Sequence, residues 1–452
     1  MMKNNNPSKP NAWDSKTMKT ANNEILPEGY KMTELGALPE EWEVAKLGEV
    51  AHISSGGSAP QGDKYFNGDK PFVRVSHIDN QNYSINKYDL INDNAINDYR
   101  LKLFPKDTII FPKSGATVYL EKRAMLPIDA YVVSHLCTVI SNKEEAIQHF
   151  LFYVLISLKL AKEKADGYPT LNISEVKQIY IPLPPLPEQQ KIASVLSAVQ
   201  EAKEKTEAVI TAAKALKKSM MKHLFTYGPV SPEETDNVPL KETEIGKVPE
   251  NWELISSNKV FSYITDGTHD TPEKLTNGIP LIKSKQIKNG KINKNEIDYF
   301  ISKKDYEIIN KRSKVDKYDI LFSMIGTIGE TALIIEVPDF AIKNVGLFKT
   351  NGNYELAIYT FYWLQTANAK NYIDKNTSGT SQKYIKLVKL KNYPILFPPL
   401  PIQQKIASIL SAIDAKIEAE ENKKQALEEL FKTLLHNLMT AKIRVNHLEV
   451  PS

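Results

Sequence analysis

Two long stretches of the chain carry hydrophobic residues at helical spacing, and neither contains glycine or proline in its interior. Pro187 and Pro401, which a first helical turn tolerates, mark where the stretches begin. The pattern predicts two long helices, over residues 187–226 and 401–445. Their stripes comprise Ile192, Leu196, Val199, Ile210 and Leu224 in the first helix and Ile406, Leu410, Ile413, Ile417, Leu427, Phe431 and Leu434 in the second.

The two stripes coincide when the sequence is shifted by 214 residues, including the polar residues near their middles. Hydrophobic positions about 3.5 residues apart favour packing against another helix. Two matched stripes in one chain therefore predict an antiparallel coiled coil within the molecule. The alternative is that each helix packs on its own globular domain.

Repeated segments show that the chain is duplicated. Residues 186–198 recur at 400–412 with eleven of thirteen positions identical, and residues 33–42 recur at 243–252. The two offsets, 214 and 210, are almost equal, so the segments between these landmarks have nearly the same length. The period is far too long for a solenoid, and it indicates a tandem duplication of a whole domain with its helix.

Each half begins with a segment rich in glycine, proline, asparagine and short β-branched runs, which predicts a mixed domain. The expected fold class is an α/β (α+β) tandem duplication, with two globular domains separated by the two long helices. Strands are expected at 109–111, 131–133, 181–183, 320–322 and 332–335, and buried helices at 151–160 and 356–364. The expected boundaries are a polar tail at 1–32, a domain at 33–186, a helix at 187–226, a linker at 227–242, a domain at 243–400, a helix at 401–445 and a tail at 446–452.

Composition narrows the class of protein only a little. No apolar run among the 452 residues is long enough to cross a bilayer, and the first 25 residues lack the apolar core of a signal peptide. We therefore expect a soluble cytoplasmic protein. The single cysteine, Cys137, lies in an apolar run and is expected to be a buried strand residue. The formal net charge of +4 is mildly basic, so nucleic-acid binding has to be argued from local features.

The motifs of four catalytic classes are missing from the sequence. There is no glycine-rich methyl-donor turn with an Asn/Asp-Pro-Pro-aromatic site, and Asp63 stands where a phosphate-binding loop needs lysine. The histidines show no metal-ligand spacing, and the aspartates at 89, 93 and 98 are scattered as in solvated turns rather than clustered as in a Mg²⁺ nuclease. We expect no catalytic, cofactor or metal site in this chain. A component with cryptic catalysis and a protein-only coiled-coil adaptor remain as alternatives.

The layout of the two halves resembles the specificity subunit of type I restriction–modification enzymes. The resemblance rests on the repeated LPxQQKIASxLSA helix start, on residues 266–272 (DGTHDTP) followed by 278–282, and on 319–329. It implies that residues 33–186 and 243–400 are target recognition domains, each reading one half of a bipartite, asymmetric DNA target. It also implies that the helices dock modification subunits, two in number, which carry S-adenosylmethionine, and that a separate restriction and motor subunit completes the complex.

The first half departs from the family pattern. Residues 55–60 replace the DGTHxTP opening, and residues 113–117 replace the second Gly-Thr turn. If the family reading holds, this divergence implies that the two domains read different half-sites.

The residues expected to contact DNA lie in a lysine run and in hydroxyl-rich turns. Residues 283–294 carry five lysines and no carboxylate, which suits phosphate contacts. The equivalent segment, 71–78, is expected to be a strand that presents Arg74 and Ser76 on one face. As the alternative, each segment is an ordinary solvated loop or turn, and His269 only caps its own turn. The candidates are Arg74, Ser76, His77, Lys113, Ser114, Thr117, Thr268, His269, Lys283, Lys285, Gln286, Lys288, Ser323, Thr327, Ser378, Thr380, Gln382 and Lys383.

Overall fold

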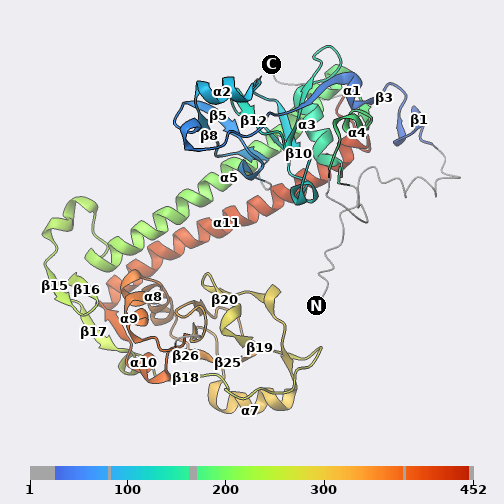
Figure 1. Ribbon diagram of the computed structural model, residues 1–452. Helices are drawn as coiled ribbons and strands as arrows, with labels where there is room; N and C mark the ends of the chain where they lie inside the picture. The colour runs from blue at the N-terminus through green and yellow to red at the C-terminus, as the bar shows by residue number, and fades with distance from the viewer. Residues whose placement is uncertain (1–25, 80–82, 162–169, 380–382, 447–452) are drawn as a thin grey trace. The chain divides into compact units, whose positions relative to one another are not determined.

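The computed structural model describes residues 26–79, 83–161, 170–379 and 383–446, which form two compact units (Figure 1). The first unit contains the chain up to Ala208 and from Glu421 onwards, and the second contains Val209–Glu420. The two long helices, α5 (Leu186–Tyr227) and α11 (Leu400–Met439), each contribute one part to each unit. The compact units therefore divide inside the helices and not at their ends.

The first unit holds two four-stranded sheets with the helices α1–α4 around them. One sheet has the order β11-β10-β13-β4 and is antiparallel throughout, and the other has the order β8-β5-β12-β9 with β5 and β12 parallel. The elements are β1 (Tyr30–Thr33), β2 (Gly36–Pro39), β3 (Glu43–Lys46), α1 (Leu47–Val50), β4 (Ala51–Ser55), β5 (Lys70–Val73), β6 (Ile78–Asp79), β7 (Ser84–Ile85), β8 (Asp89–Ile91), α2 (Asp93–Tyr99), β9 (Leu103–Phe104), β10 (Ile109–Pro112), β11 (Ala124–Met125), β12 (Ala130–Val132), β13 (Leu136–Ser141), α3 (Gln148–Ser157), α4 (Ile173–Lys177) and β14 (Tyr180–Leu183).

The second unit repeats this plan. Its antiparallel sheet has the order β18-β26-β23-β24, and its mixed sheet has the order β22-β19-β25 with β19 and β25 parallel. The elements are β15 (Leu240–Thr243), β16 (Gly246–Pro249), β17 (Glu253–Ser256), α6 (Ser257–Val260), β18 (Tyr263–Asp266), β19 (Ile279–Lys283), β20 (Ile287–Lys288), β21 (Lys291–Ile292), β22 (Phe300–Ile301), α7 (Lys303–Ser313), β23 (Ile320–Ser323), β24 (Thr331–Leu333), β25 (Ala341–Lys343), β26 (Val345–Lys349), α8 (Tyr354–Leu364), α9 (Ala367–Asn376), α10 (Leu387–Lys391) and β27 (Pro394–Phe397).

The duplication seen in the sequence is therefore a duplication of topology. Each unit has a hairpin (β1–β2 or β15–β16), a buried tryptophan after it (Trp42 or Trp252), and a strand pair (β3–β14 or β17–β27) whose members precede and follow the two larger sheets in sequence. The expected tandem α/β (α+β) duplication is confirmed.

The two long helices run antiparallel within each unit. In the first unit, Lys424 on α11 forms an ion pair with Glu207 on α5, and Arg444 beyond the end of α11 pairs with Glu188 near the start of α5. In the second unit, the ammonium of Lys217 lies 2.7 Å from the carboxylate of Asp414. The antiparallel coiled coil predicted from the stripes is confirmed.

The stripes also pack into the domain cores, so the two interpretations of the stripes are both true. One core contains Ile192, Leu196 and Phe431 together with the apolar helix α3, and the other contains Leu224, Ile406 and Leu410 together with α8. Val199 and Leu434 lie partly buried against the first core, and Ile210 and Ile417 are buried further along the helices. Ile413 and Leu427 are half-buried.

Most of the expected elements are present, with two corrections. The second long helix ends at Met439, six residues before the expected boundary, where Ala441 adopts a left-handed conformation with φ 53° that closes the helix. The expected strand over 71–78 ends at Val73, because Arg74 begins a 3-10 turn, η3 (Val75–His77). Cys137 lies fully buried on β13, as predicted. No helix in the described ranges is long and apolar enough to cross a membrane.

Candidate nucleic-acid interface

In the second unit, four of the expected DNA-contacting segments are joined by hydrogen bonds. The Asn344 side chain lies 2.7 Å from Nδ1 of His269, and its carbonyl accepts a bond from the Ser284 hydroxyl. The same hydroxyl accepts a bond from the Met324 amide, and the Met324 carbonyl accepts one from the Ile385 amide. These bonds join the turns at 266–272, 283–288 and 323–329 to the described residues of the next segment, 377–379 and 383–385, and we name the face that carries them the second reading face.

The DGTHDTP turn is held in place by buried charge. Asp266 is 4% exposed, and its carboxylate lies 3.0 Å from Nε2 of His269 and 3.3 Å from the Arg312 guanidinium. Arg312 also donates to the Gly267 carbonyl, and a Cβ at Gly267 would lie 2.3 Å from the Ile342 carbonyl oxygen. Only glycine fits at that close approach. His269 therefore does hold its own turn, while its side chain stays 65% exposed.

The first unit builds an equivalent surface from different residues. The Ser114 hydroxyl lies 2.6 Å from Nδ1 of His135, and the Lys113 amide donates to the His135 carbonyl. The neighbouring Ser134 amide donates to the Gly57 carbonyl. A Cβ at Gly56 would lie 2.0 Å from the Val132 carbonyl oxygen, so the Ser55–Pro60 segment meets the same steric limit as the DGTHDTP turn. We name this surface, with residues 74–77 and 113–117, the first reading face.

The turn after β5 matches the turn after β19 residue by residue. The Arg74 amide donates to Nδ1 of His77 at 3.1 Å, and the Lys283 amide donates to Oε1 of Gln286 at 2.9 Å, so the third residue caps each 3-10 turn. Burial lowers the pKa of His77 and of Lys283. The Lys283 ammonium lies 3.9 Å from the centre of the Tyr299 ring. The two turns thus share a backbone design and differ in their side chains.

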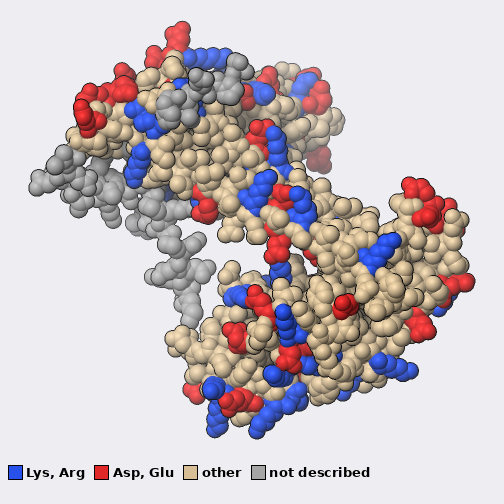
Figure 2. Space-filling model, turned by 180° about the vertical axis from the view of Figure 1, so that it is seen from behind, with Lys and Arg blue, Asp and Glu red and all other residues tan. Residues whose placement is uncertain are grey.

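The lysine run is not a bare cationic patch, which corrects the expectation from sequence. Four of its lysines form ion pairs with carboxylates that come from outside the run: Lys285 with Asp298, Lys288 with Glu296, Lys291 with Glu418 and Lys294 with Glu336. Exposed pairs of this kind contribute about 1 kcal/mol or less to the stability of the fold. Figure 2 shows cationic and anionic side chains interspersed over the visible surface.

The remaining candidates divide into surface and interior positions. Gln286 is 1% exposed and Ser323 is fully buried, so neither side chain can reach DNA directly. The Gln286 side chain accepts a hydrogen bond from the Lys283 amide and donates to the Glu296 carbonyl and to the Asp298 carboxylate. Thr380 and Gln382 lie outside the described residues. The candidates with exposed or half-exposed side chains on the two faces are Arg74, Ser76, His77, Lys113, Ser114, Thr117, Thr268, His269, Lys283, Lys285, Lys288, Thr327, Ser378 and Lys383.

Four residues that organise the faces were not singled out from the sequence. Arg312 and Lys343 clamp the DGTHDTP turn, Lys343 by donating to the His269 and Asp270 carbonyls. Asn344 and His135 connect neighbouring turns in the two faces. The amides of Ser134 and Asn344 donate equivalent hydrogen bonds, to the carbonyls of Gly57 and Thr268. An alignment of the two halves, strand by strand, is the signal that could have identified the loop that contains these residues.

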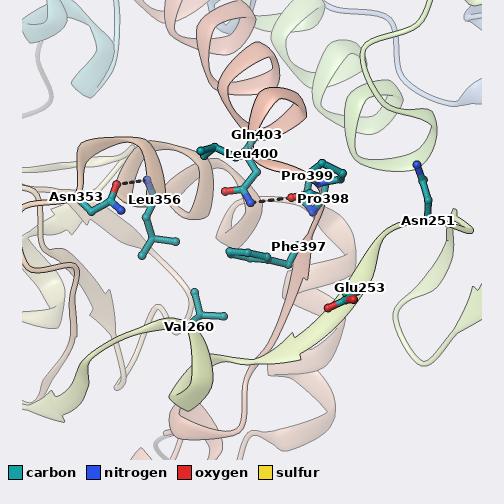
Figure 3. A pocket seen from close by; sticks show the side chains of 10 residues that line it. All are labelled: Asn251, Glu253, Val260, Asn353, Leu356, Phe397, Pro398, Pro399, Leu400 and Gln403. Atoms are coloured by element: carbon teal, nitrogen blue, oxygen red, sulfur yellow. Dashed lines mark hydrogen bonds between the residues drawn. The ribbon is translucent and has the colours of Figure 1, made fainter.

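One hollow of about 470 Å³ lies in the second unit, between the β17–β27 pair and the start of α11 (Figure 3). Six of its ten lining residues are apolar, among them Phe397 of β27 and Leu400 of α11, and Glu253 of β17 is the charged residue of the lining (Figure 3). None of the predicted DNA-contacting residues lines it. Among the described residues, no group of three or more His, Cys, Asp or Glu side chains is placed to hold a metal ion.

Comparison with known proteins identifies the family. The family model described as "Type I restriction modification DNA specificity domain" matches twice, at residues 39–212 and 249–429. The putative type I restriction enzyme MjaX specificity subunit of Methanocaldococcus jannaschii is 29% identical over 92% of this chain and 97% of its own length. The type I restriction enzyme MjaVIII specificity subunit of the same organism is 27% identical over 91% of this chain and 95% of its own length.

Solved structures show the same fold. The crystal structure of the type I restriction–modification system S subunit from M. genitalium has a TM-score of 0.57 at 17% identity, covering 88% of this chain and 96% of that one. A chain from structural work on complex assembly and conformational transition of the type I R-M system has a TM-score of 0.51 at 18% identity, covering 90% and 99%. Since the family model matches in two copies over well over half of the chain, the protein belongs to the type I restriction–modification DNA specificity family.

Proposed function

We propose that this chain is the DNA-recognition subunit of a type I restriction–modification complex and reads a bipartite, asymmetric target, one half with each reading face. The observation that carries the proposal is that the two units share one topology but place different side chains at equivalent positions. The two faces use the same backbone bonds, yet Arg74 and His77 in one stand where Lys283 and Gln286 stand in the other. Equivalent scaffolds with different donors and acceptors suit two different half-sites.

The helices α5 and α11 are proposed to dock modification subunits, two in number. Their outward positions are rich in exposed lysine and glutamate, as on a helix pair that presents a polar surface to partners. S-adenosylmethionine is proposed to belong to those partners, and DNA cleavage to a separate restriction and motor subunit. In this proposal the present chain determines which DNA sequence is recognised and performs no chemistry of its own.

The test is a methyl-transfer assay with and without the modification subunit. The purified chain alone is expected neither to methylate nor to cut DNA, and addition of the modification subunit is expected to give sequence-specific adenine methylation. Methyl transfer by the lone chain would favour a catalytic protein. Failure of the chain to bind duplex DNA, alone and with its partner, would favour a protein-only adaptor.

A further inference from the structure

The two reading faces share one arrangement of a carboxylate with a capping residue and a cation. Asp89 and Asp298 stand at a constant offset of 209 residues, the same offset that relates Arg74 to Lys283 and His77 to Gln286. Asp89 begins β8, which pairs with β5, and Asp298 lies two residues before β22, which pairs with β19. The carboxylate and the capped turn therefore correspond between the halves, whereas the paired cations, Arg74 and Lys285, stand at different positions of their turns.

In each face the carboxylate divides its two oxygens between the same two tasks. Oδ1 of Asp298 accepts a bond of 3.4 Å from the Gln286 amide, and Oδ1 of Asp89 lies 3.7 Å from Nε2 of His77. The other oxygen of each carboxylate pairs with a cation, which is Lys285 at 2.7 Å in the second face and Arg74 in the first. One oxygen therefore hydrogen-bonds the capping residue in the second face and lies beyond hydrogen-bond distance of it in the first, and the other oxygen of each carboxylate holds a side chain that reaches the surface.

Energetics argue against stability as the main role of these carboxylates. Lys285 and Asp298 are both about half exposed, and an exposed pair contributes little to folding. A fixed negative charge on a surface that binds phosphates also lowers affinity for DNA. What the carboxylate can supply is orientation, because it limits the positions that a long and flexible cation adopts.

We propose that Asp89 and Asp298 are positioning residues for base readout, each holding its 3-10 turn and its cation so that the cation meets the base edge in one orientation. The proposal rests on the proposed function in DNA recognition and adds two residues to it. Arg74 and Lys285 are then the side chains that touch DNA, while His77 and Gln286 transmit the constraint to the backbone. The hydrogen bond from Lys285 lowers the pKa of Asp298, which is therefore ionised at neutral pH.

The experiment uses the full chain assembled with its modification subunits, and maps adenine methylation genome-wide for the wild type, Asp298→Asn and Asp89→Asn. Asp298→Asn should relax base identity in one half-site by about tenfold or more, the discrimination that one specific base contact supplies. Asp89→Asn should relax the other half-site and leave the first unchanged. The slope of log K against log salt should also steepen by about 0.9 in Asp298→Asn, because Lys285 becomes available to a phosphate.

Controls separate positioning from folding and from charge. Glu242→Gln, on the β15–β16 hairpin, makes the same change of charge and should leave both half-sites intact. Thermal melting checks each variant, and Lys285→Gln, at a half-exposed position, tests the same contact if Asp298→Asn does not fold. Half-sites that stay sharp in active Asp298→Asn or Lys285→Gln complexes would overturn the proposal, as would equal loss in both halves. A wild-type complex with no bipartite motif would instead overturn the proposed function.

Discussion

At the scale of single residues, whether the charge of a lysine is balanced by a carboxylate depends on spatial neighbours that the sequence does not reveal. The run from Lys283 to Lys294 contains no carboxylate, yet Asp298 and Glu418 reach it, the latter from a helix more than a hundred residues away. Composition identified the segment, but the ion pairs depend on tertiary structure. The same holds for Gln286, which looks like a base-reading amide in the sequence and is an interior cap in the structure.

The first prediction concerns the phosphate contacts of this run. Lys283→Ala together with Lys288→Ala should weaken DNA binding and flatten the slope of log K against log salt, by about 0.9 for each phosphate that is no longer neutralised. Binding titrations over a range of salt concentrations measure the slope, with Lys247→Ala on the β15–β16 hairpin as the matched control. An unchanged slope in the double variant would mean that these lysines only solvate the loop.

The second prediction concerns Cys137. Burial raises its pKa to about 12, above the value of about 8.5 in an unfolded chain. Because the thiol ionises more readily in the unfolded chain than in the folded one, ionisation favours unfolding. The stabilisation from the buried neutral thiol is therefore complete below pH 8.5 and is lost as the pH rises toward 12. Urea unfolding of the wild type and of Cys137→Ala should give a stability difference about 3 kcal/mol smaller at pH 10.5 than at pH 7. An identical difference at both pH values would contradict burial of the thiol.

At the scale of elements, the start of α5 is fixed by a buried carboxylate. Glu188 is 4% exposed, accepts a bond of 2.9 Å from the Trp42 indole, and pairs with both ends of the Arg444 guanidinium at 2.7 and 2.8 Å. The carboxylates of Glu188 and Glu41 raise the pKa of Arg444. The last described residues of the chain therefore secure the first turn of the long helix in the first unit.

Removing one partner should cost more than removing both. Arg444→Ala should lower the free energy of unfolding by about 3 kcal/mol, because the Glu188 carboxylate is left buried without its cation. Glu188→Gln combined with Arg444→Ala should recover part of that loss, since an amide tolerates the site better than a charge does. Denaturant unfolding of the four proteins in a double-mutant cycle measures the coupling, and strict additivity would show that the pair is not coupled.

The elements themselves were largely predictable, and the reasons are physical. Strands such as β10 and β23 and the long helices have strong, uninterrupted patterns, and the apolar helices α3 and α8 are buried on all sides, as expected. The strand expected at 71–78 was wrong beyond Val73 because alternation there competes with a side-chain cap from His77, which a period-two pattern does not show. The reading faces depend on contacts between distant turns, which no local pattern contains.

At the scale of the whole molecule, the duplication makes each half a separate reader on a shared framework. In the second half, β18 to β26 carry the DGTHDTP turn, the 3-10 turn and the turn after β23. The strand pair β17–β27 and the helices α8 and α10 stay outside that segment, and Tyr362 on α8 hydrogen-bonds Asp414 on α11 at 2.8 Å. The segment 262–350 shares the core of the second unit with this framework and pairs with α11 through Lys291 and Glu418, so an exchange has to keep those core positions.

The final prediction follows from this separation. Replacing residues 262–350 with the corresponding segment of a relative should change one half of the methylated motif and leave the other half unaltered, because the first reading face keeps every contact that it has. Genome-wide mapping of methylated adenines gives both half-sites in one experiment. The matched control is the same exchange in the first half, over the segment from β4 to β13, which should change the opposite half-site. If a folded, active chimera acquires two new half-sites, the halves are not independent, and recognition has to be attributed to the molecule as a single reader.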